Sequence, residues 1–413
     1  MKKGHIGVVS LFVFVFFLSA GAYSPALAQG AKGAPIRIGA YIPLAGAGYQ
    51  GGQDTKAALD IAVEKANKSG GLLGRPVEIV VRDHKGEVPV ANRTAQELME
   101  REKVKVLIGG GGSAVVLAGS SVAQKSHVPL LASMGNSESI VAQKGHDYVC
   151  LLGPNSGMEA RAFAGYSVKQ GWKKFITIAP DYEWGHSQVD MFKEKMKDLG
   201  VSAQVENIWF KLGETEFSRY ITQLQAAQVD AILVYAWGGD NVSFTKQAAQ
   251  YGLFSKKTPV AGWWMLDALI SLGKEAPEGV IGFERAPFSY LQEKIPLARE
   301  FTSEFRKKTN SYPSGYALMA YDAFLVWKKA VEKVGTDDPE KVSKAIRGMP
   351  FDSTRGTISI REVDGQAEVP VYFGEVYQDK NLGIPTYRKV SEVKASDVWL
   401  SPEKVKELRA SAK

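Results

Sequence analysis

The feature that most constrains this chain is a regular alternation of short apolar segments with longer helical patterns. Segments rich in β-branched residues, such as Ile36–Ile42 and Val77–Arg82, are separated by stretches in which apolar residues recur every three or four positions, such as Asp54–Asn67. Strands that alternate with helices in this way are typical of a parallel sheet covered by helices on its faces. The sequence therefore predicts an α/β fold.

The alternation runs through the chain twice. The first series continues to a strand at Asp147–Leu152, and the second starts with a helix at Gly157–Gln170 and ends near Val280–Phe283. After Phe283 come three helical patterns and hairpin-like strands without a fresh series, as expected for segments that complete domains already begun. We therefore expect two lobes, built from residues 35–153 plus about 284–365 and from residues 154–283 plus about 366–413. A chain that crosses repeatedly between two lobes forms a hinge.

The first 28 residues have the pattern of a secretory signal peptide. A basic start at Met1–Lys3 precedes an apolar run over Ile6–Ala20, and an Ala-x-Ala cleavage pattern ends at Ala28. A membrane-spanning anchor needs about 18 to 20 apolar residues, and this run is shorter. We expect export to the periplasm with cleavage after Ala28. The single cysteine, Cys150, allows no intramolecular disulfide in that oxidising compartment.

Charge and histidine distribution argue against two other classes of protein. The net charge is +7, but the charges are scattered, and beyond Lys256-Lys257 and Arg306–Lys308 no basic cluster is interleaved with aromatic residues, as the basic stripe of a nucleic-acid-binding surface would require. The histidines after the leader are isolated and lack the paired spacing of zinc ligands. We therefore expect no nucleic-acid partner, no metal site and no cofactor.

The segments that follow the predicted strands are the candidate binding site, because ligands of open parallel sheets bind beyond the carboxyl ends of the strands. Glycine in such a segment lets the backbone approach a ligand, and Ser113 and Asn136 can donate hydrogen bonds and cap the next helix. The first half thus supplies polar donors, and the second half supplies tryptophans. The segments are Gly109–Ala114, Ser133–Asn136, Pro180–Gly185, Ala236–Asp240 and Gly262–Trp264.

Several motifs together give a resemblance to a known family. They are Ile36–Gly46, Ala66-Asn67 with Gly70–Gly74, Arg82-Asp83, Val106–Gly109 with Ser113, Pro180–Gly185 and Asp230–Tyr235. In this order they resemble the leucine/isoleucine/valine-binding proteins of ABC transporters, across nearly the whole mature chain. The resemblance implies a type I periplasmic binding protein with two Rossmann-like lobes, parallel-sheet cores and a hinge of three crossings. It implies a monomeric, non-enzymatic receptor that delivers a small molecule to a membrane permease.

The resemblance also implies ligand-binding residues. Ser113 and Asn136 match the family positions that bind the ligand carboxylate, with Met134 supplying a backbone contact, and Trp184 matches the aromatic residue that covers the ligand. Neighbouring residues of the same segments complete the candidate site. The full set is Ser113, Ala114, Met134, Gly135, Asn136, Tyr182, Trp184, Trp237 and Trp264.

One departure from the family concerns the ligand ammonium group. Amino-acid binders of the family place a glutamate where Trp263-Trp264 stand here. Asp240, Asp267 and Glu159 are acids that could replace it, but none aligns with that role. A carboxylate ligand with an aromatic or bulky apolar body is therefore expected, and recognition of an amino acid stays open.

Other classes of function fit the sequence less well. Gly109-x-Gly111-x-x-Ala114 has the spacing of a dinucleotide-binding turn, but it follows the third strand and lacks the acid expected about 20 residues later. Ser113 does not stand in the Gly-x-Ser-x-Gly elbow of hydrolases. An exported enzyme is thus a remote alternative. A ligand-sensing module that acts with a signalling partner stays open, because the same fold serves both functions.

Overall fold

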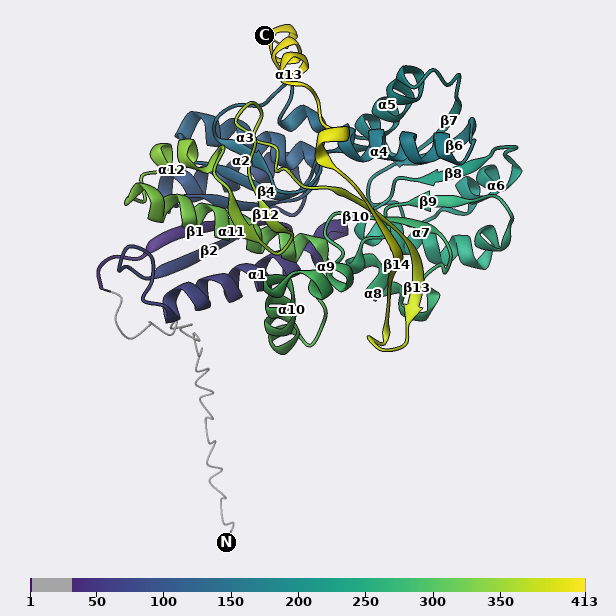
Figure 1. Ribbon diagram of the computed structural model, residues 1–413. Helices are drawn as coiled ribbons and strands as arrows, with labels where there is room; N and C mark the ends of the chain where they lie inside the picture. The colour runs from purple at the N-terminus through teal and green to yellow at the C-terminus, as the bar shows by residue number, and fades with distance from the viewer. Residues whose placement is uncertain (2–31, 413) are drawn as a thin grey trace.

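The computed structural model describes Met1 and residues 32–412 of the chain, so the expected signal peptide lies almost entirely outside the described residues. Two sheets with helices on their faces form two lobes, which lie beside one another and are joined by several connecting segments (Figure 1). The predicted α/β fold with two lobes and parallel-sheet cores is confirmed.

The first lobe is built on a five-stranded parallel sheet. Strands β3 and β4 are buried throughout, as expected for a parallel sheet covered on both faces. The strand order is β2 (Val77–Asp83), β1 (Ile36–Ile42), β3 (Leu107–Gly110), β4 (Leu130–Met134) and β5 (Val149–Leu151). Its helices are α1 (Tyr49–Lys68), α2 (Val88–Gln96), α3 (Ser113–Ser126), α10 (Pro296–Thr309), α11 (Gly315–Val334) and α12 (Pro339–Ile346).

Helix α11 is the central element of this lobe's core. Fourteen of its 20 residues are buried, including Trp327, and they pack with strand and α1 residues in one apolar cluster. The segment after residue 284 therefore returns to the first lobe. A short antiparallel pair, β11 (Phe351–Ser353) and β12 (Gly356–Ile358), follows these helices.

The second lobe is built on a seven-stranded sheet. Strands β6 to β10 pair in parallel, and β13 adds to β10 in the antiparallel direction, followed by β14. The strand order is β14 (Ile384–Val393), β13 (Val371–Asp379), β10 (Ile281–Glu284), β9 (Val260–Gly262), β8 (Ala231–Val234), β6 (Lys174–Pro180) and β7 (Gln204–Phe210). Its helices are α4 (Ser156–Lys169), α5 (Glu183–Asp198), α6 (Ser218–Ala226), α7 (Gly238–Gln250) and α8 (Leu266–Leu272).

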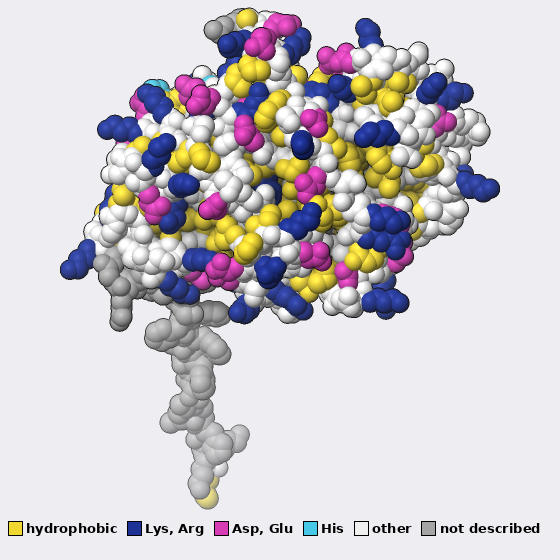
Figure 2. Space-filling view, viewed as in Figure 1, with side chains coloured by type: hydrophobic (Ala, Val, Ile, Leu, Met, Phe, Trp, Pro, Cys, Tyr) yellow, Lys and Arg dark blue, Asp and Glu magenta, His cyan; other side chains and the backbone are white. Residues whose placement is uncertain are grey.

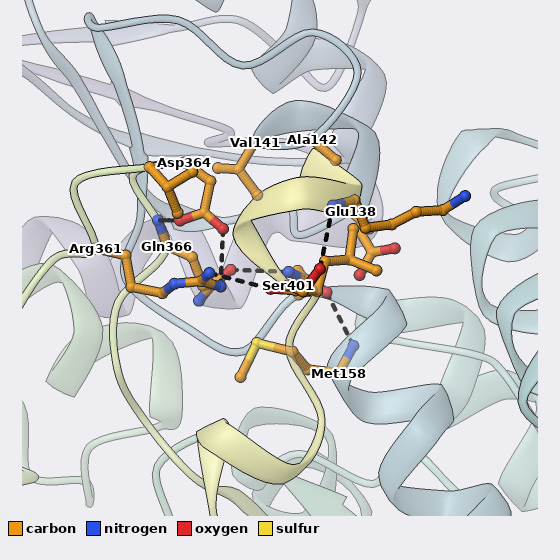
Figure 3. Close-up of polar contacts among 12 residues, drawn as sticks. Glu138, Val141, Ala142, Met158, Arg361, Asp364, Gln366 and Ser401 are labelled. Carbon is orange, nitrogen blue, oxygen red and sulfur yellow. Dashed lines mark hydrogen bonds and ion pairs between the residues drawn. The ribbon is translucent and has the colours of Figure 1, made fainter. Parts of the chain in front are cut away.

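Three segments connect the sheets, and hydrogen bonds join the first of them to the third. They run from β5 to α4, from β10 to α9 (Phe288–Lys294), and from β12 to β13. Gln366 in the third segment accepts a hydrogen bond from Asn155 in the first at 3.0 Å and donates one to the carbonyl of Gly153 at 2.7 Å. Figure 3 shows Gln366 beside Asp364 and Arg361. Two of the three hinge segments are therefore bonded to each other and are not independent linkers.

The C-terminal segment lies across both lobes. After β14, Val398 and Trp399 pack with the core of the second lobe. Helix α13 (Pro402–Ser411) then lies against the first lobe, where Arg409 donates to the carbonyls of Val141 and Val363 at 2.9 Å each. The limits of the lobes, with residues 366–413 in the second lobe, stay a prediction, and α13 contacts the first lobe through Arg409. The Arg409 guanidinium donates to carbonyl groups that are distant in sequence, and no sequence pattern indicates this contact.

The surface carries both signs of charge. Figure 2 shows basic and acidic side chains interspersed over the visible face, without a region of one sign alone. In the part of the chain that the structure describes, no helix combines the length and apolar character needed to cross a membrane.

Replacing Arg409 by Ala is expected to lower stability by about 1 to 3 kcal/mol, because three part-buried carbonyls lose their donor. Thermal unfolding measures this as a lower melting temperature. Lys406→Ala, on an exposed position of the same helix, is the matched control and is expected to leave the melting temperature unchanged. Equal melting temperatures for both variants would show that α13 is not held by Arg409.

Candidate functional site

A cavity lies between the lobes where the carboxyl ends of strands from both sheets meet. About 280 Å³ of space at this place is not filled by atoms, a volume that includes space open to solvent. Residues after β3 and β4 form its first-lobe side, and residues after β6, β8, β9 and β10 form the opposite side. This is the position at which open parallel sheets bind ligands. The lining residues are Gly111, Ser113, Gly135, Asn136, Tyr182, Trp184, Trp237, Trp263, Met265, Arg285 and Tyr316.

Ser113 is oriented by the backbone that follows β4. Its Oγ accepts hydrogen bonds from the N–H groups of Asn136 at 3.2 Å and Ser137 at 3.0 Å. Because a hydroxyl oxygen has two lone pairs, these bonds use its acceptor capacity and leave the hydroxyl proton to donate elsewhere. The N–H groups of Ser113 and Ala114, in the first turn of α3, have no partner among the described residues. The N-terminus of α3 thus presents donors and a positive dipole end.

His84 holds the glycine turn before Ser113 in place through a hydrogen bond to its backbone. Gly110 has φ +114°, and a Cβ there would collide with the carbonyl oxygen of Met134, so the turn requires glycine. The ring nitrogen Nδ1 of His84 accepts from the N–H of Gly86 at 3.1 Å, and Nε2 lies 3.2 Å from the carbonyl oxygen of Gly110. Nε2 therefore carries the proton and donates it. Burial lowers the pKa of His84, which keeps the ring neutral.

Asn136 contributes an acceptor to the cavity and not the expected donor. Both hydrogens of its side-chain amide are used within the protein, toward the carbonyl of Pro154 at 2.8 Å and Oε2 of Glu159 at 2.9 Å. Its Oδ1 is buried and has no partner among the described residues. The sequence identified the residue but not its orientation, because the choice depends on Glu159, which lies 23 positions away in the next lobe.

Arg285 is the most important lining residue that sequence reasoning missed. It follows β10 in the second connecting segment and is almost fully buried, with Nε 2.7 Å from Oε1 of Glu159. Burial alone would lower the pKa of this guanidinium, but Glu159, Tyr316 and Glu284 more than offset the effect and raise it, so Arg285 is charged. A charged Glu-Arg pair directly after the apolar strand Ile281–Phe283 was the available signal.

Four aromatic residues form the second-lobe side of the cavity. Trp184 lies at 89° to Trp263 with ring centres 5.8 Å apart, and Trp237 donates its indole N–H to the hydroxyl of Tyr182 at 3.0 Å. The structure thus brings Tyr182, Trp184 and Trp237 together as the sequence placed them. Sequence periodicity predicts helices over Ser187–Leu199 and Val242–Tyr251, but α5 and α7 each begin four residues earlier. Trp184 is in the first helical turn, and Trp237 is the N-cap residue of α7.

Three expected residues do not line the cavity. Trp264 is fully buried in the core of the second lobe, where its indole N–H donates to Oγ1 of Thr245 at 2.9 Å. Trp263, its neighbour, takes the position at the cavity. Met134 is expected to make only a backbone contact, and its side chain packs in the first-lobe core. The Ala114 side chain does not line the space, so only its backbone N–H, beside Ser113, is available to a ligand. Adjacent residues in an irregular segment point to different sides, and the sequence does not decide which one faces the cleft.

The lobes are in contact across the mouth of the cleft. Oε1 of Glu183, the first residue of α5, accepts hydrogen bonds from the hydroxyls of Ser137 at 2.7 Å and Ser139 at 2.6 Å in the first lobe. On the other side, Gly238 lies so close to Ala47 that a Cβ would collide with its carbonyl oxygen. The structure therefore shows the cleft closed.

A group of buried acids lies next to the cavity. Asp267 of α8 is influenced by Asp54 of α1 and by Glu284, and one of its carboxylate oxygens has no partner among the described residues. Burial, with a further contribution from both neighbours, raises the pKa of Asp267 to about 7, and burial raises that of Asp54 to about 6. Within residues 32–412, no set of three or more potential ligands is arranged to hold a metal ion.

Comparison with known proteins identifies the family. The family described as periplasmic binding protein matches residues 35–381. The chain belongs to this family. It is 24% identical to the leucine-, isoleucine-, valine-, threonine- and alanine-binding protein of Pseudomonas aeruginosa, over 88% of this chain and 94% of that protein. It is 27% identical to a Leu/Ile/Val-binding protein homologue of Brucella melitensis, over 91% and 93% of the two chains. The expected leucine/isoleucine/valine-binding family is confirmed.

Solved structures show the same fold. A solute-binding protein of an ABC transporter from Rhodopseudomonas palustris, in complex with 3,4-dihydroxybenzoic acid, has a TM-score of 0.80 at 23% identity, over 87% of this chain and 98% of that one. The branched-chain amino acid binding protein of Streptococcus pneumoniae, in complex with isoleucine, has a TM-score of 0.74 at 21% identity, over 87% and 100%. Such periplasmic binding proteins hold both aromatic acids and amino acids on one fold.

The raised pKa values give this binding protein a defined pH dependence. The folded protein keeps protons on Asp267 and Asp54 that the unfolded chain releases above about pH 4, so stability falls as pH rises from about 4 to 7. Asp267→Asn is expected to raise the melting temperature at pH 8 and to flatten its dependence on pH. Asp190→Asn, at an exposed position, is the control. If the melting temperature depended on pH in the same way in wild type and Asp267→Asn, the raised pKa of Asp267 would be contradicted.

Glu183→Ala is expected to shift the cleft toward an open form, because the two serine hydroxyls lose their acceptor in the opposite lobe. Small-angle scattering without ligand would show a larger radius of gyration than for wild type. Asp190→Ala on the exposed side of the same helix is the matched control. An unchanged radius in both variants would mean that these contacts do not hold the lobes together.

Proposed function

We propose that this protein is the solute receptor of an ABC importer and captures a small monocarboxylate with an aromatic or bulky apolar body. It acts in the periplasm after cleavage behind Ala28, as a monomer that delivers its ligand to a membrane permease, and it catalyses no reaction. The observation that carries the proposal is the free hydroxyl proton of Ser113, beside two free N–H groups at the start of α3.

The first lobe supports binding of the carboxylate. Three donors converge at the N-terminus of a 14-residue helix, whose dipole favours negative charge. Hydrogen bonds from such donors to a carboxylate are charge-assisted and shorter and stronger than neutral ones. No acidic side chain lines the cavity on this side. The family relationship supports the same role for Ser113.

The second lobe supports an apolar and flat ligand body. Tyr182, Trp184, Trp237 and Trp263 enclose the space with aromatic surface, and Met265 adds an adaptable side chain. Rhodopseudomonas palustris relatives of this fold hold 3,4-dihydroxybenzoic acid and benzoate, which shows that the fold admits such ligands.

The acceptors near the cavity support a ligand without an ammonium group. The oxygens of Glu159 already accept from Asn136, Gln188 and Arg285. Asp267 has an oxygen without a partner among the described residues, but it does not line the cavity. Oδ1 of Asn136 is a neutral acceptor, and a buried ammonium without a carboxylate partner is strongly unfavourable. Leucine and its relatives are therefore poorer candidates than organic acids.

Calorimetry with matched pairs of ligands tests the proposal. Protein freed of bound ligand is titrated with benzoate, with 3-phenylpropionate and with phenylalanine, which is the 2-amino derivative of 3-phenylpropionate. The expected result is binding of the two acids and weaker or no binding of phenylalanine. Tight binding of phenylalanine or leucine, with loss when the amino group is removed, would overturn the proposed ligand class.

Ser113→Ala is expected to weaken binding of the carboxylate ligand roughly ten- to hundredfold, because a donor to a desolvated carboxylate contributes about 1.5 to 3 kcal/mol. Ser121→Ala is the control, since Ser121 lies on the exposed side of the same helix. Wild-type affinity in Ser113→Ala would refute the carboxylate anchor.

A further inference from the structure

Two hydrogen-bond donors of the cavity wall have no partner in the protein. The indole nitrogens of Trp184 and Trp263 are buried, and within residues 32–412 neither donates to any group. Both side chains line the cavity and are 3% and 2% exposed. A buried donor without a partner costs about 1 to 3 kcal/mol, so such groups are normally satisfied by water or ligand. An apolar ligand body alone would leave both unsatisfied.

Arg285 adds a third donor on the same side of the cavity. Its Nε and Nη2 face Glu159 at 2.7 and 3.5 Å, whereas Nη1 has no hydrogen-bond partner in the part of the chain that the structure describes. Glu159 balances its charge and fixes the plane of the guanidinium. The group can therefore donate to a neutral oxygen as well as to an anion.

The donors of the cavity thus form two separate sets. Ser113 and the start of α3 belong to the first lobe, and Trp184, Trp263 and Arg285 belong to the second lobe and the hinge. A ligand with one carboxylate can engage the first set only. The second set requires another acceptor, on the part of the ligand that faces the second lobe.

We propose that the ligand is an aromatic acid whose ring carries a second oxygen atom, and that Trp184, Trp263 and Arg285 form the site for this oxygen. The inference rests on the proposed function and deepens it. A hydroxyl, carbonyl or second carboxylate oxygen accepts hydrogen bonds from indole and guanidinium groups. A hydroxyl can also donate to Oδ1 of Asn136, the unpartnered acceptor of the same cavity. An acid without this oxygen leaves the donors unpaired and is discriminated against for that reason.

The test compares the affinity of benzoate with those of 3-hydroxybenzoate, 4-hydroxybenzoate and terephthalate by calorimetry. At least one oxygenated acid is expected to bind about tenfold or more tightly than benzoate, the effect of one additional buried hydrogen bond. In Trp184→Phe and Trp263→Phe the ring is largely retained and the N–H is lost, so the preference is expected to fall about fivefold or more in at least one of them. Trp327→Phe is the matched control, because Trp327 is also buried with an unpartnered N–H but lies in the core of α11.

Arg285→Lys separates recognition from a general effect on the hinge. Loss of hinge structure would weaken the binding of all acids by the same factor. Loss of a donor to the second oxygen would instead lower the preference for oxygenated acids over benzoate. Melting temperatures of the variants show whether each one folds. If Trp184→Phe and Trp263→Phe did not fold, the wild-type preference and that of Arg285→Lys would decide.

The outcomes distinguish the two proposals. Binding of the acids with no preference for ring oxygen, or with a preference unchanged in all three variants, overturns this inference and leaves the carboxylate receptor intact. Failure of every acid to bind overturns the proposed function, and this inference with it. The inference is supported if the preference for oxygenated acids is lost in Trp184→Phe or Trp263→Phe and kept in Trp327→Phe.

Discussion

The arrangement of the site depends on one buried carboxylate, that of Glu159. Its two oxygens accept hydrogen bonds from Asn136 of the first lobe, from Gln188 of α5 in the second lobe and from Arg285 in the hinge. Three parts of the chain that are far apart in sequence therefore meet at one group. A buried ion pair of this kind adds little net stability compared with apolar residues, but removing one partner costs about 3 to 5 kcal/mol, because the other charge stays buried.

The position of this carboxylate determines what the cavity offers a ligand. Because Glu159 and the carbonyl of Pro154 take both amide hydrogens of Asn136, the residue presents its oxygen to the cavity. These side-chain bonds also fix the position of the Asn136 backbone N–H, which donates to Oγ of Ser113. Because Oγ accepts there, the hydroxyl proton of Ser113 points away from the loop after β4. On the other side, Glu159 fixes the guanidinium of Arg285. The donors of both lobes thus depend on a residue that does not itself line the cavity.

The secondary structure was predictable from the sequence because burial and periodicity are local. Sequence periodicity predicts a helix over Gly315–Val334 and a strand over Ile36–Ile42, which are the residues that α11 and β1 occupy, since both apolar patterns are long and regular. Short amphipathic elements without clear patterns were missed, among them α8, α9 and α13. The starts of α5 and α7 were placed too late, because aromatic and glycine residues in a first turn resemble those of a loop.

For the binding site, the sequence by itself determined which strand ends carry polar donors and which carry tryptophans, since the order of strands and helices fixes the edge of the sheet at which these segments lie. It also determined the family, through motifs spread along the chain. Only the tertiary structure decided that Trp263 and not Trp264 faces the cleft, that the amide hydrogens of Asn136 are used within the protein and its oxygen is left without a partner, and that Arg285 belongs to the site. These choices depend on partners that are distant in sequence, such as Thr245 for Trp264 and Glu159 for Asn136 and Arg285. A side chain in an irregular segment takes the orientation that satisfies its buried polar atoms, and those partners exist only once both lobes and the hinge are assembled.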